Sequence, residues 1–380
     1  MDLNKAIKNK IDRSKWVKWK FTDLVENIVE KVVPKDSRLK HYIGLEHLDP
    51  GSLKIRRFGE TSSLIGDKLK IYKGDLIFAK RNAYLKRVAI ADFDAVASAH
   101  SMVLRPKVEN VLPEFLPFFL LSEQFWQRAI EISVGSLSPT INWKSLAKQE
   151  FFLPLKEEQA KLAKLLWTMN KVIERENIAL EKLNIAKSVL LKSFFTENTN
   201  EVQLIKIGEI VTGSTPSTKN SDYWDGNIQF ITPADLQEQI YIGNTERYIT
   251  EKGLQATREI PPNSVMVVCI ASVGKMGIST KRCSTNQQIN TIIPSKDIDP
   301  KYLFNTLNLF RHRIISRSAN SVVPILNKGD FGLIKMPILE KSEREDFVRN
   351  ADKFDLSIIN LKNKFSFSNT LQKSLINQIF

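Results

Sequence analysis

An internal repeat constrains the fold of this 380-residue chain more than any other feature. The sequence aligns with itself at an offset of about half its length, and four pairs of segments match in the same order. These pairs are residues 19–25 with 205–211, 42–50 with 230–238, 69–92 with 258–280, and 138–154 with 323–337. Because the chain exceeds the usual size of one domain, the repeat predicts two globular halves with the same fold.

The third pair of segments predicts a β-hairpin in each half. Residues 69–92 and 258–280 both run through a turn, an apolar β-branched stretch, a polar loop and a second short apolar stretch. This order is typical of two strands joined by an elaborated tip. Together with the helical segments described next, it predicts an α+β fold class in which α/β-type domains occur twice.

Each half ends in a long segment without proline or glycine, at residues 157–195 and 341–380. Both segments have the seven-residue periodicity of a coiled-coil helix. The first predicted seam consists of Leu162, Leu165, Met169, Val172, Glu176, Ala179, Leu183, Ala186, Leu190 and Ser193. The second consists of Phe347, Ala351, Phe354, Ile358, Leu361, Phe365, Ser368, Gln372, Leu375 and Ile379.

Two arrangements of these helices fit the periodicity. Each apolar stripe could pack on its own half, as a single amphipathic helix does. We favour pairing of the two helices, because helices of matched length end two matched repeats. A pseudo-two-fold relation between the halves would make the helices antiparallel and place them between the globular domains. The predicted limits are 1–156 for the first globular domain, 157–196 for the first spacer helix, 197–340 for the second globular domain and 341–380 for the second spacer helix.

The net charge of +14 indicates a polyanionic partner, either nucleic acid or an acidic membrane surface. Residues 1–156 carry 27 basic and 18 acidic side chains, whereas residues 196–339 carry 15 and 13. The long helices are nearly balanced in charge, so they do not form a basic membrane-binding face. The longest apolar run, residues 265–271, is too short to span a membrane, and the N-terminus has no apolar signal sequence.

The sequence has none of the usual signatures of a catalytic or cofactor site. GSTPST at residues 213–218 lacks the Lys-Ser/Thr ending of a phosphate-binding loop, and the four histidines have no metal-ligand spacing. The two cysteines, Cys269 and Cys283, do not form a CxxC pair, which is typical of a reducing cytoplasm. We therefore predict a cytoplasmic protein without catalytic residues, cofactor or metal. A catalytic site built from carboxylates without a motif stays open as an alternative.

The predicted hairpin tip of the first half is basic. The segment KRNAYLKR, residues 80–87, has four basic side chains and one tyrosine. Lysine can reach DNA phosphates and arginine can bind guanine edges, although a charge run is as often a solvated loop. With the short polar turn before the next apolar run, the candidate DNA-binding residues of this half are Lys80, Arg81, Asn82, Tyr84, Lys86, Arg87, Ser98 and His100.

The second half offers polar loops in place of a basic tip. Its tip, residues 271–277, has one lysine and two glycines that permit close approach of the backbone. The Asn and Gln side chains at 286–288 suit adenine edges but can equally cap a turn. The loop at 213–226 ends in two aromatic residues, Tyr223 and Trp224, which we expect to pack beneath it. The candidates of this half are Ser217, Thr218, Lys219, Asn220, Ser272, Lys275, Asn286, Gln287 and Gln288, and Arg313 with Arg317 could contact a phosphate or serve solubility.

Taken together, the repeat, the helices and the loops resemble the specificity subunit of type I restriction-modification enzymes. The resemblance covers nearly the whole length and is most specific in the second half. It is carried there, in order, by GSTPSTKNSDYW (213–224), FITPADL (230–236), ASVGK (271–275), NQQIN (286–290) and LNKGDFGLIKMPI (326–338). The first half is more divergent and lacks the GSTPS loop.

This resemblance implies a non-catalytic subunit with two target-recognition domains, each reading one part of a split DNA site. It also implies its partners: double-stranded DNA, two DNA methyltransferase subunits that modify adenine, and restriction and translocation subunits. Because the loops of the two halves differ, we expect the two half-sites to differ as well. A stand-alone two-headed DNA-binding protein, a repressor or an architectural protein, is the alternative. Such a protein would bury its heptad faces fully between its own helices.

Overall fold

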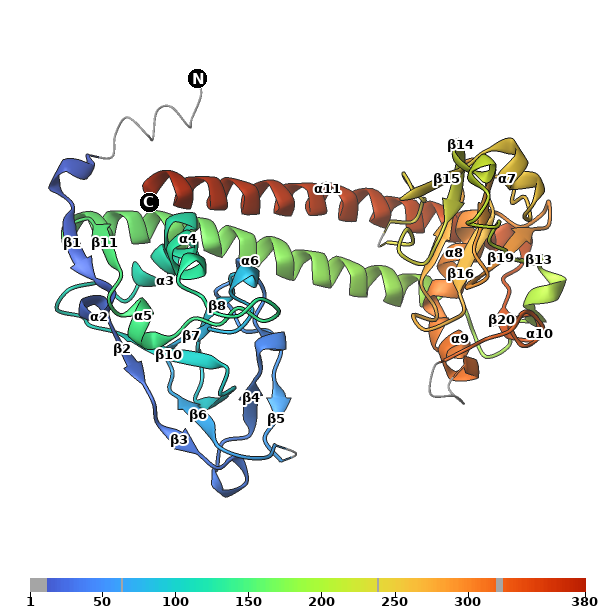
Figure 1. The fold of residues 1–380 in the computed structure, drawn as a ribbon. Helices are drawn as coiled ribbons and strands as arrows, with labels where there is room; N and C mark the ends of the chain where they lie inside the picture. The colour runs from blue at the N-terminus through green and yellow to red at the C-terminus, as the bar shows by residue number, and fades with distance from the viewer. Residues whose placement is uncertain (1–11, 63, 238, 319–323) are drawn as a thin grey trace. The chain divides into compact units, whose positions relative to one another are not determined.

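The computed structural model describes residues 12–62, 64–237, 239–318 and 324–380 (Figure 1). Contacts divide the chain into two compact units. The first unit extends to Ile178 and includes Lys362–Phe380, and the second comprises Ala179–Leu361. Each unit contains strands, short helices and a part of both long helices, which confirms the α+β fold class with two repeated domains.

The first unit contains eleven labelled strands in three small sheets. Its strands are β1 Val17–Lys20, β2 Val25–Ile28, β3 Lys31–Val32, β4 His41–Ile43, β5 Gly59–Glu60, β6 Lys68–Ile71, β7 Leu76–Ala79, β8 Val88–Ile90, β9 Ala95–Ala97, β10 Ser101–Pro106 and β11 Glu150–Leu153. Its short helices are α2 Phe21–Leu24, α3 Leu116–Leu121, α4 Glu123–Glu131 and α5 Trp143–Leu146. The strand orders are β2-β10-β7-β8, β3-β6-β9-β4-β5 and β1-β11.

The second unit repeats most of this plan. Its strands are β12 Glu201–Gln203, β13 Gly208–Thr212, β14 Trp224–Ile231, β15 Arg247–Ile249, β16 Val265–Val268, β17 Met276–Ile278, β18 Cys283–Thr285, β19 Ile289–Pro294 and β20 Lys335–Pro337. Its short helices are α7 Glu251–Gln255, α8 Pro300–Leu309, α9 Arg311–Ser318 and α10 Lys328–Gly332. The strand orders are β13-β19-β16-β17, β15-β14-β18 and β12-β20.

Strand pairing confirms the internal repeat. The order β2-β10-β7-β8 of the first unit has its counterpart in β13-β19-β16-β17 of the second, and all of these pairs are antiparallel. Each unit also pairs two of its named strands in parallel, β4 with β9 in the first and β14 with β18 in the second. The predicted hairpins are β7–β8 and β16–β17.

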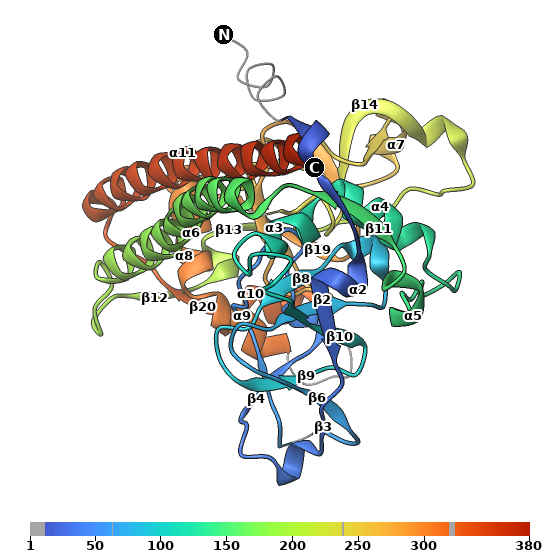
Figure 2. The ribbon, with the colours of Figure 1, turned by 90° about the vertical axis from the view of Figure 1, so that its left-hand side faces the viewer.

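The core of the first unit lies between its four-stranded sheet and the long helices. Helices α3 and α4 fill this space (Figure 1), and Phe78 of β7 stacks on Trp126 of α4 with ring centroids 5.1 Å apart. Leu166 and Leu375, which belong to the two long helices, are buried in the same cluster. Strands β3, β4, β6 and β9 lie on the side of the unit away from α3 (Figure 2). The strands that lead into the loops at the sheet ends therefore pack against this core.

The two predicted long helices are α6 (Lys156–Lys192) and α11 (Lys341–Ile379). In the first unit, the amide of Gln372 donates to the Leu166 carbonyl at 3.4 Å, and Lys364 lies 3.7 Å from Glu176. Later residues of α6 therefore face earlier residues of α11, so the two segments are antiparallel there, as predicted.

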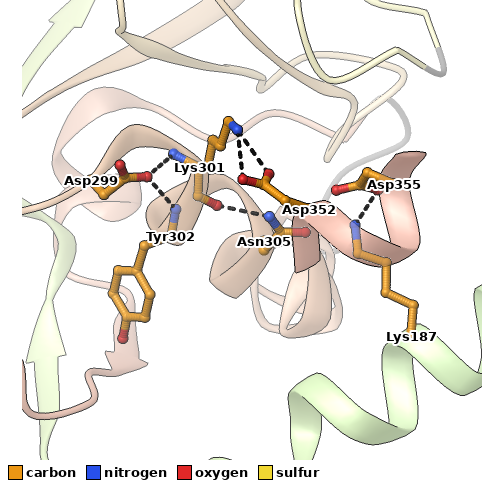
Figure 3. Close-up of polar contacts among 7 residues, drawn as sticks. All are labelled: Lys187, Asp299, Lys301, Tyr302, Asn305, Asp352 and Asp355. Atoms are coloured by element: carbon orange, nitrogen blue, oxygen red, sulfur yellow. Dashed lines mark hydrogen bonds and ion pairs between the residues drawn. The ribbon is translucent and has the colours of Figure 1, made fainter. Parts of the chain in front are cut away.

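The second unit shows the same direction. Lys187 forms an ion pair with Asp355 at 2.6 Å (Figure 3), and the rings of Phe194 and Phe347 lie 5.6 Å apart. In addition, Lys301 of α8 contacts both carboxylate oxygens of Asp352, at 2.8 and 2.9 Å. This contact joins the start of α8 to α11 at Asp352, within the second unit.

The predicted seam is right for α11 and half wrong for α6. In α11 the buried side chains include Phe347, Ala351, Ile358, Gln372, Leu375 and Ile379, all at predicted positions. In α6 the buried apolar side chains are instead Ala163, Leu166, Ile173, Leu180 and Leu191. The predicted positions Leu165, Val172, Ala186, Leu190 and Ser193 are exposed. Two neighbouring stripes of α6 are apolar, and tertiary packing, not periodicity, selects between them.

Candidate nucleic-acid interface

Predicted DNA-contacting segments of the first unit emerge at one end of its four-stranded sheet. Residues 80–87 connect β7 to β8, and the turn at 98–100 leads into β10, the neighbour of β7. The backbone N–H of Lys80 donates to the carbonyl of His100 at 3.2 Å and joins the two segments. Candidates from separate parts of the sequence therefore share one surface.

Lys80 and Arg81 are the available cations of this surface. Arg81 is exposed, and its guanidinium lies 3.5 Å from Nε2 of His100. Lys80 is half-buried, burial lowers the pKa of its ammonium, and no acidic side chain in the described ranges contacts it. Burial, followed by the charge of Arg81, lowers the pKa of His100, so the imidazole is neutral at pH 7. Tyr84 is also exposed and can contact a ligand.

Other predicted residues of this tip are engaged within the protein. Lys86 forms an ion pair with Glu123 of α4. The guanidinium of Arg87 donates to the Leu45 carbonyl at 2.7 Å. Asn82 is not engaged in this way: its backbone is left-handed with φ of 56°, and its side-chain oxygen is buried without a hydrogen-bond partner. The tip therefore offers fewer free cations than its sequence indicates.

The second unit brings its predicted segments together in the same way. Residues 269–275 connect β16 to β17, and the turn at 286–288 leads into β19. The backbone N–H of Cys269 donates to the carbonyl of Gln288 at 2.8 Å, the counterpart of the bond that joins tip and turn in the first unit. At this tip Lys275 is exposed, and Ser272 is half-buried.

The loop at 213–220 adds to this second surface. Its Thr215 hydroxyl donates to Oε1 of Gln287 at 2.8 Å, which ties the loop to the turn. Trp224 packs beneath the loop as predicted, because its indole N–H donates to the Ser217 carbonyl at 3.1 Å. The exposed candidates of the loop are Ser217, Thr218 and Lys219.

Three predicted candidates hold turns with their side chains. The Ser98 hydroxyl accepts the backbone N–H of His100 at 3.2 Å, and Asn286 accepts that of Gln288 at 3.1 Å. Asn220 also accepts a backbone N–H two residues further on, at 3.1 Å. These contacts correspond to the turn-capping alternative, whereas Gln287 remains exposed beside the turn.

Comparison with known proteins assigns the family. The sequence model of the type I restriction modification DNA specificity domain matches the chain twice, at residues 14–184 and 196–366. The chain belongs to this family. It is 34% identical to the type I restriction enzyme MjaIX specificity subunit of Methanocaldococcus jannaschii over 172 residues, which are 43% of this chain and 39% of that protein. It is 22% identical to the HindI specificity subunit of Haemophilus influenzae over 383 residues, covering 77% of this chain and 82% of that one.

A solved structure shows the same fold. The chain is similar, with a TM-score of 0.57 and 18% identity over 96% of both chains, to a chain in a structure described as showing complex assembly and conformational transition of the type I R-M system. This likeness covers both repeats of the present chain. It therefore agrees with the two matches of the family model.

The second tip of this family member has a cation that the sequence did not predict. Arg311 is the first residue of α9 and is exposed. Gly274 in the tip has φ of +90°, and a Cβ there would lie 3.1 Å from Cγ of Arg311. The guanidinium donates to Oδ1 of Asn308 at 2.6 Å, and among the described residues it has no acidic partner. No local signal could reveal it, because Arg311 reaches the tip only through the packing of α9.

Two other arginines of α9 are paired with acids. Arg313 contacts Glu201 at 2.7 Å, and Arg317 contacts Asp330 at 3.0 Å. These ion pairs leave Arg311 as the cation of α9 that lies against the tip.

Neither cysteine is a reactive group. Cys269 and Cys283 are both buried, and burial raises the pKa of their thiols to about 11 and about 12. Within 12–62, 64–237, 239–318 and 324–380, no group of three or more His, Cys, Asp or Glu side chains is placed to hold a metal. Among the same residues, no helix has both the length and the apolar character needed to span a bilayer.

Proposed function

We propose that this specificity-family member reads a DNA site in two parts, one at the sheet end of each unit. One observation carries the proposal: at the corresponding ends of their four-stranded sheets, the two units offer different exposed polar side chains from different loops. The first offers Arg81, and the second offers Lys219 and Gln287. Arginine favours guanine edges and glutamine favours adenine edges, so the two parts of the site differ in sequence.

The chain acts as a binding subunit, and its partners perform the chemistry. Membership in the specificity family supports this role, as does the lack of a catalytic motif in the sequence. Two methyltransferase subunits modify adenine in the site, and restriction and translocation subunits complete the complex. Residues 157–196 and 341–380 serve as spacers that set the separation of the two half-sites.

An exposed apolar stripe of α6 supports docking of a methyltransferase subunit. Leu165 is 46% exposed and Val172 is 41% exposed, and a spacing of seven residues puts them on one helix face. A stand-alone DNA-binding protein would bury such a stripe within itself. The exposed stripe therefore favours a chain that is built into a larger complex.

A docking test follows from this stripe. Replacing Leu165 and Val172 together by Asp should abolish co-purification with the methyltransferase subunit, because two buried charges oppose the interface. Ile65→Asp makes the same chemical change at a site that is 85% exposed on a loop before β6, and it should leave co-purification intact. Equal retention of the partner by both variants would contradict docking on α6.

The function itself is tested by mapping methylated adenines in a host genome with and without the gene. The expected result is the loss of methylation at one split motif when the gene is absent. An unchanged methylation map would contradict the proposal. If the purified chain also bound one DNA sequence tightly without partners, the stand-alone alternative would replace it.

A further inference from the structure

A cavity of about 240 Å³ lies at the sheet end of the first unit from which residues 80–87 and 98–100 emerge. Six parts of this unit line it: the end of β2, the start of β3, the start of β6, the residue after β7, the start of β10 and the segment that enters α5. Its polar lining residues are Asn27, Lys31, Asp67, Lys68, Lys80, Ser101 and Asn142, together with the indole of Trp143.

Charge in this cavity is strongly unbalanced. Three lysines face one acidic residue, Asp67, which lies 3.8 Å from Lys31. The ammonium of Lys68 donates to the carbonyls of its own loop, at 2.6 Å to Ile65. Lys80 has no comparable partner among the described residues, although it is half-buried. A partly desolvated cation without a counterion is costly. The position of the Lys80 ammonium therefore favours binding of an anion.

Several neutral polar side chains line the cavity and make no hydrogen bond within the described residues. Ser101 is 1% exposed, and its hydroxyl has no hydrogen-bond partner. The side chains of Asn27 and Trp143, which are half-buried, and of Asn142, which is exposed, make no hydrogen bond within the part of the chain that the structure describes, so Ser101 is the buried polar group of this set. Buried polar groups are nearly always satisfied in a working complex. The cavity therefore combines an uncompensated ammonium, a buried hydroxyl and amide donors.

We propose that this cavity binds one backbone phosphate of the bound DNA, with Lys80 as the charge partner and Ser101 as the buried hydrogen-bond partner. The inference rests on the proposed DNA-reading function and assigns this site a positioning role, because a phosphate contact carries no sequence information. A base edge presents both donors and acceptors, whereas a phosphate presents only acceptors. A lysine point charge beside a hydroxyl and amide groups that can donate matches the phosphate.

In the second unit, the positions equivalent to this cavity hold side chains that bond to one another. Cys269 occupies the position of Lys80, as the matching backbone bonds to the following turn show. The Thr212 hydroxyl donates to Oδ1 of Asn290 at 2.6 Å, and the amide of Asn290 donates to the Leu326 carbonyl at 3.3 Å. These side chains satisfy one another. We therefore assign the phosphate cavity to the first unit alone.

The test uses the full chain assembled with its methyltransferase subunits, and a duplex that carries its methylation motif beside a scrambled duplex. Binding is measured over a series of salt concentrations. Lys80→Met should lower the slope of log affinity against log salt by about 0.9, the value for one phosphate contact. The ratio of motif to scrambled affinity should not change. Lys80→Arg should retain the slope of the unmodified chain, and Ser101→Ala should weaken binding about fivefold without changing the slope.

Lys73→Met is the matched control, because Lys73 is an exposed lysine in the turn between β6 and β7, at the opposite end of β7. It should leave slope and affinity unchanged. An unchanged slope in Lys80→Met, or a changed preference at a base pair, would overturn the phosphate assignment. If the unmodified complex does not prefer its motif, the proposed function fails. A slope reduction in Lys80→Met on scrambled DNA would even then support the cavity.

Discussion

The sheet ends of the two units share one backbone plan but obtain their positive charge from different elements. In the first unit, the cations Lys80 and Arg81 come from the strand connection itself. In the second, the tip contributes Lys275, and Arg311 of α9 lies against it. The charge of the tip segment alone therefore understates the positive charge beside the second tip. Tertiary neighbours supply what the local segment lacks.

The two units also differ in how they hold polar groups between the long helices. In the second unit, Lys187 and Asp355 are both mostly buried and lie 2.6 Å apart. In the first, Glu176 is buried, but its partner Lys364 is 68% exposed and 3.7 Å away. The Lys187–Asp355 pair is a close buried contact, whereas the Glu176 carboxylate is poorly compensated by Lys364.

The largest expected effect comes from breaking the close pair. Asp355→Ala leaves the buried ammonium of Lys187 without a partner and should lower the free energy of unfolding of the second unit by about 3 kcal/mol. Hydrogen exchange of the amides of residues 341–361 measures this loss. Asp346→Ala is the control, since its ion pair with Arg349 on the same helix is exposed. Similar protection in both variants would contradict the contrast.

Arg81→Ala tests the first sheet end. Loss of a bidentate base contact should weaken binding to the motif by about 2 kcal/mol and relax preference at one base pair. Titration with duplexes that differ at single positions measures both effects. Lys86→Ala removes a charge from the same tip, but Glu123 already neutralises it, so the change should be much smaller. A larger effect of Lys86→Ala would reverse the assignment of the two cations.

Glu176→Leu tests the polar contact between the long helices in the first unit, and it should stabilise the protein where Asp355→Ala destabilises it. The substitution replaces a buried carboxylate, whose oxygens accept no hydrogen bond, by an apolar side chain of similar volume. It should stabilise the first unit by about 1 kcal/mol, because the remaining Lys364 is exposed to water. Calorimetric unfolding reports this gain. Glu157→Leu, at an exposed position of α6, should show no such gain, and destabilisation by Glu176→Leu would refute the argument.

The smallest expected effect concerns Arg311. If its guanidinium contacts a phosphate at the second tip, Arg311→Ala should reduce the salt slope of binding by about 1 and weaken motif and scrambled DNA equally. Arg317→Ala removes an arginine of the same helix that is paired with Asp330, and it should leave the slope unchanged. The same slope for both variants would show that the second surface obtains no charge from α9.

Sequence patterns predict those features that depend on local order or repetition. The repeat, both hairpins, the antiparallel long helices and the position of Trp224 beneath its loop are all present in the structure. The seam of α6 was half wrong, because Leu165 and Leu166 both belong to apolar stripes and only packing selects the second. Arg311 and the lining of the cavity were not predictable, since residues far apart in sequence meet there through tertiary contacts.

The two units are expected to prefer different bases. Measuring the base preference of one variant from each unit tests this most directly. The assembled complex, its Arg81→Ala variant and its Gln287→Ala variant are titrated with duplexes in which every position of the motif is changed in turn. We expect Arg81→Ala to relax preference in one part of the motif only and Gln287→Ala in the other part only. Changes of both variants in the same part, or in neither part, would contradict reading by two separate surfaces.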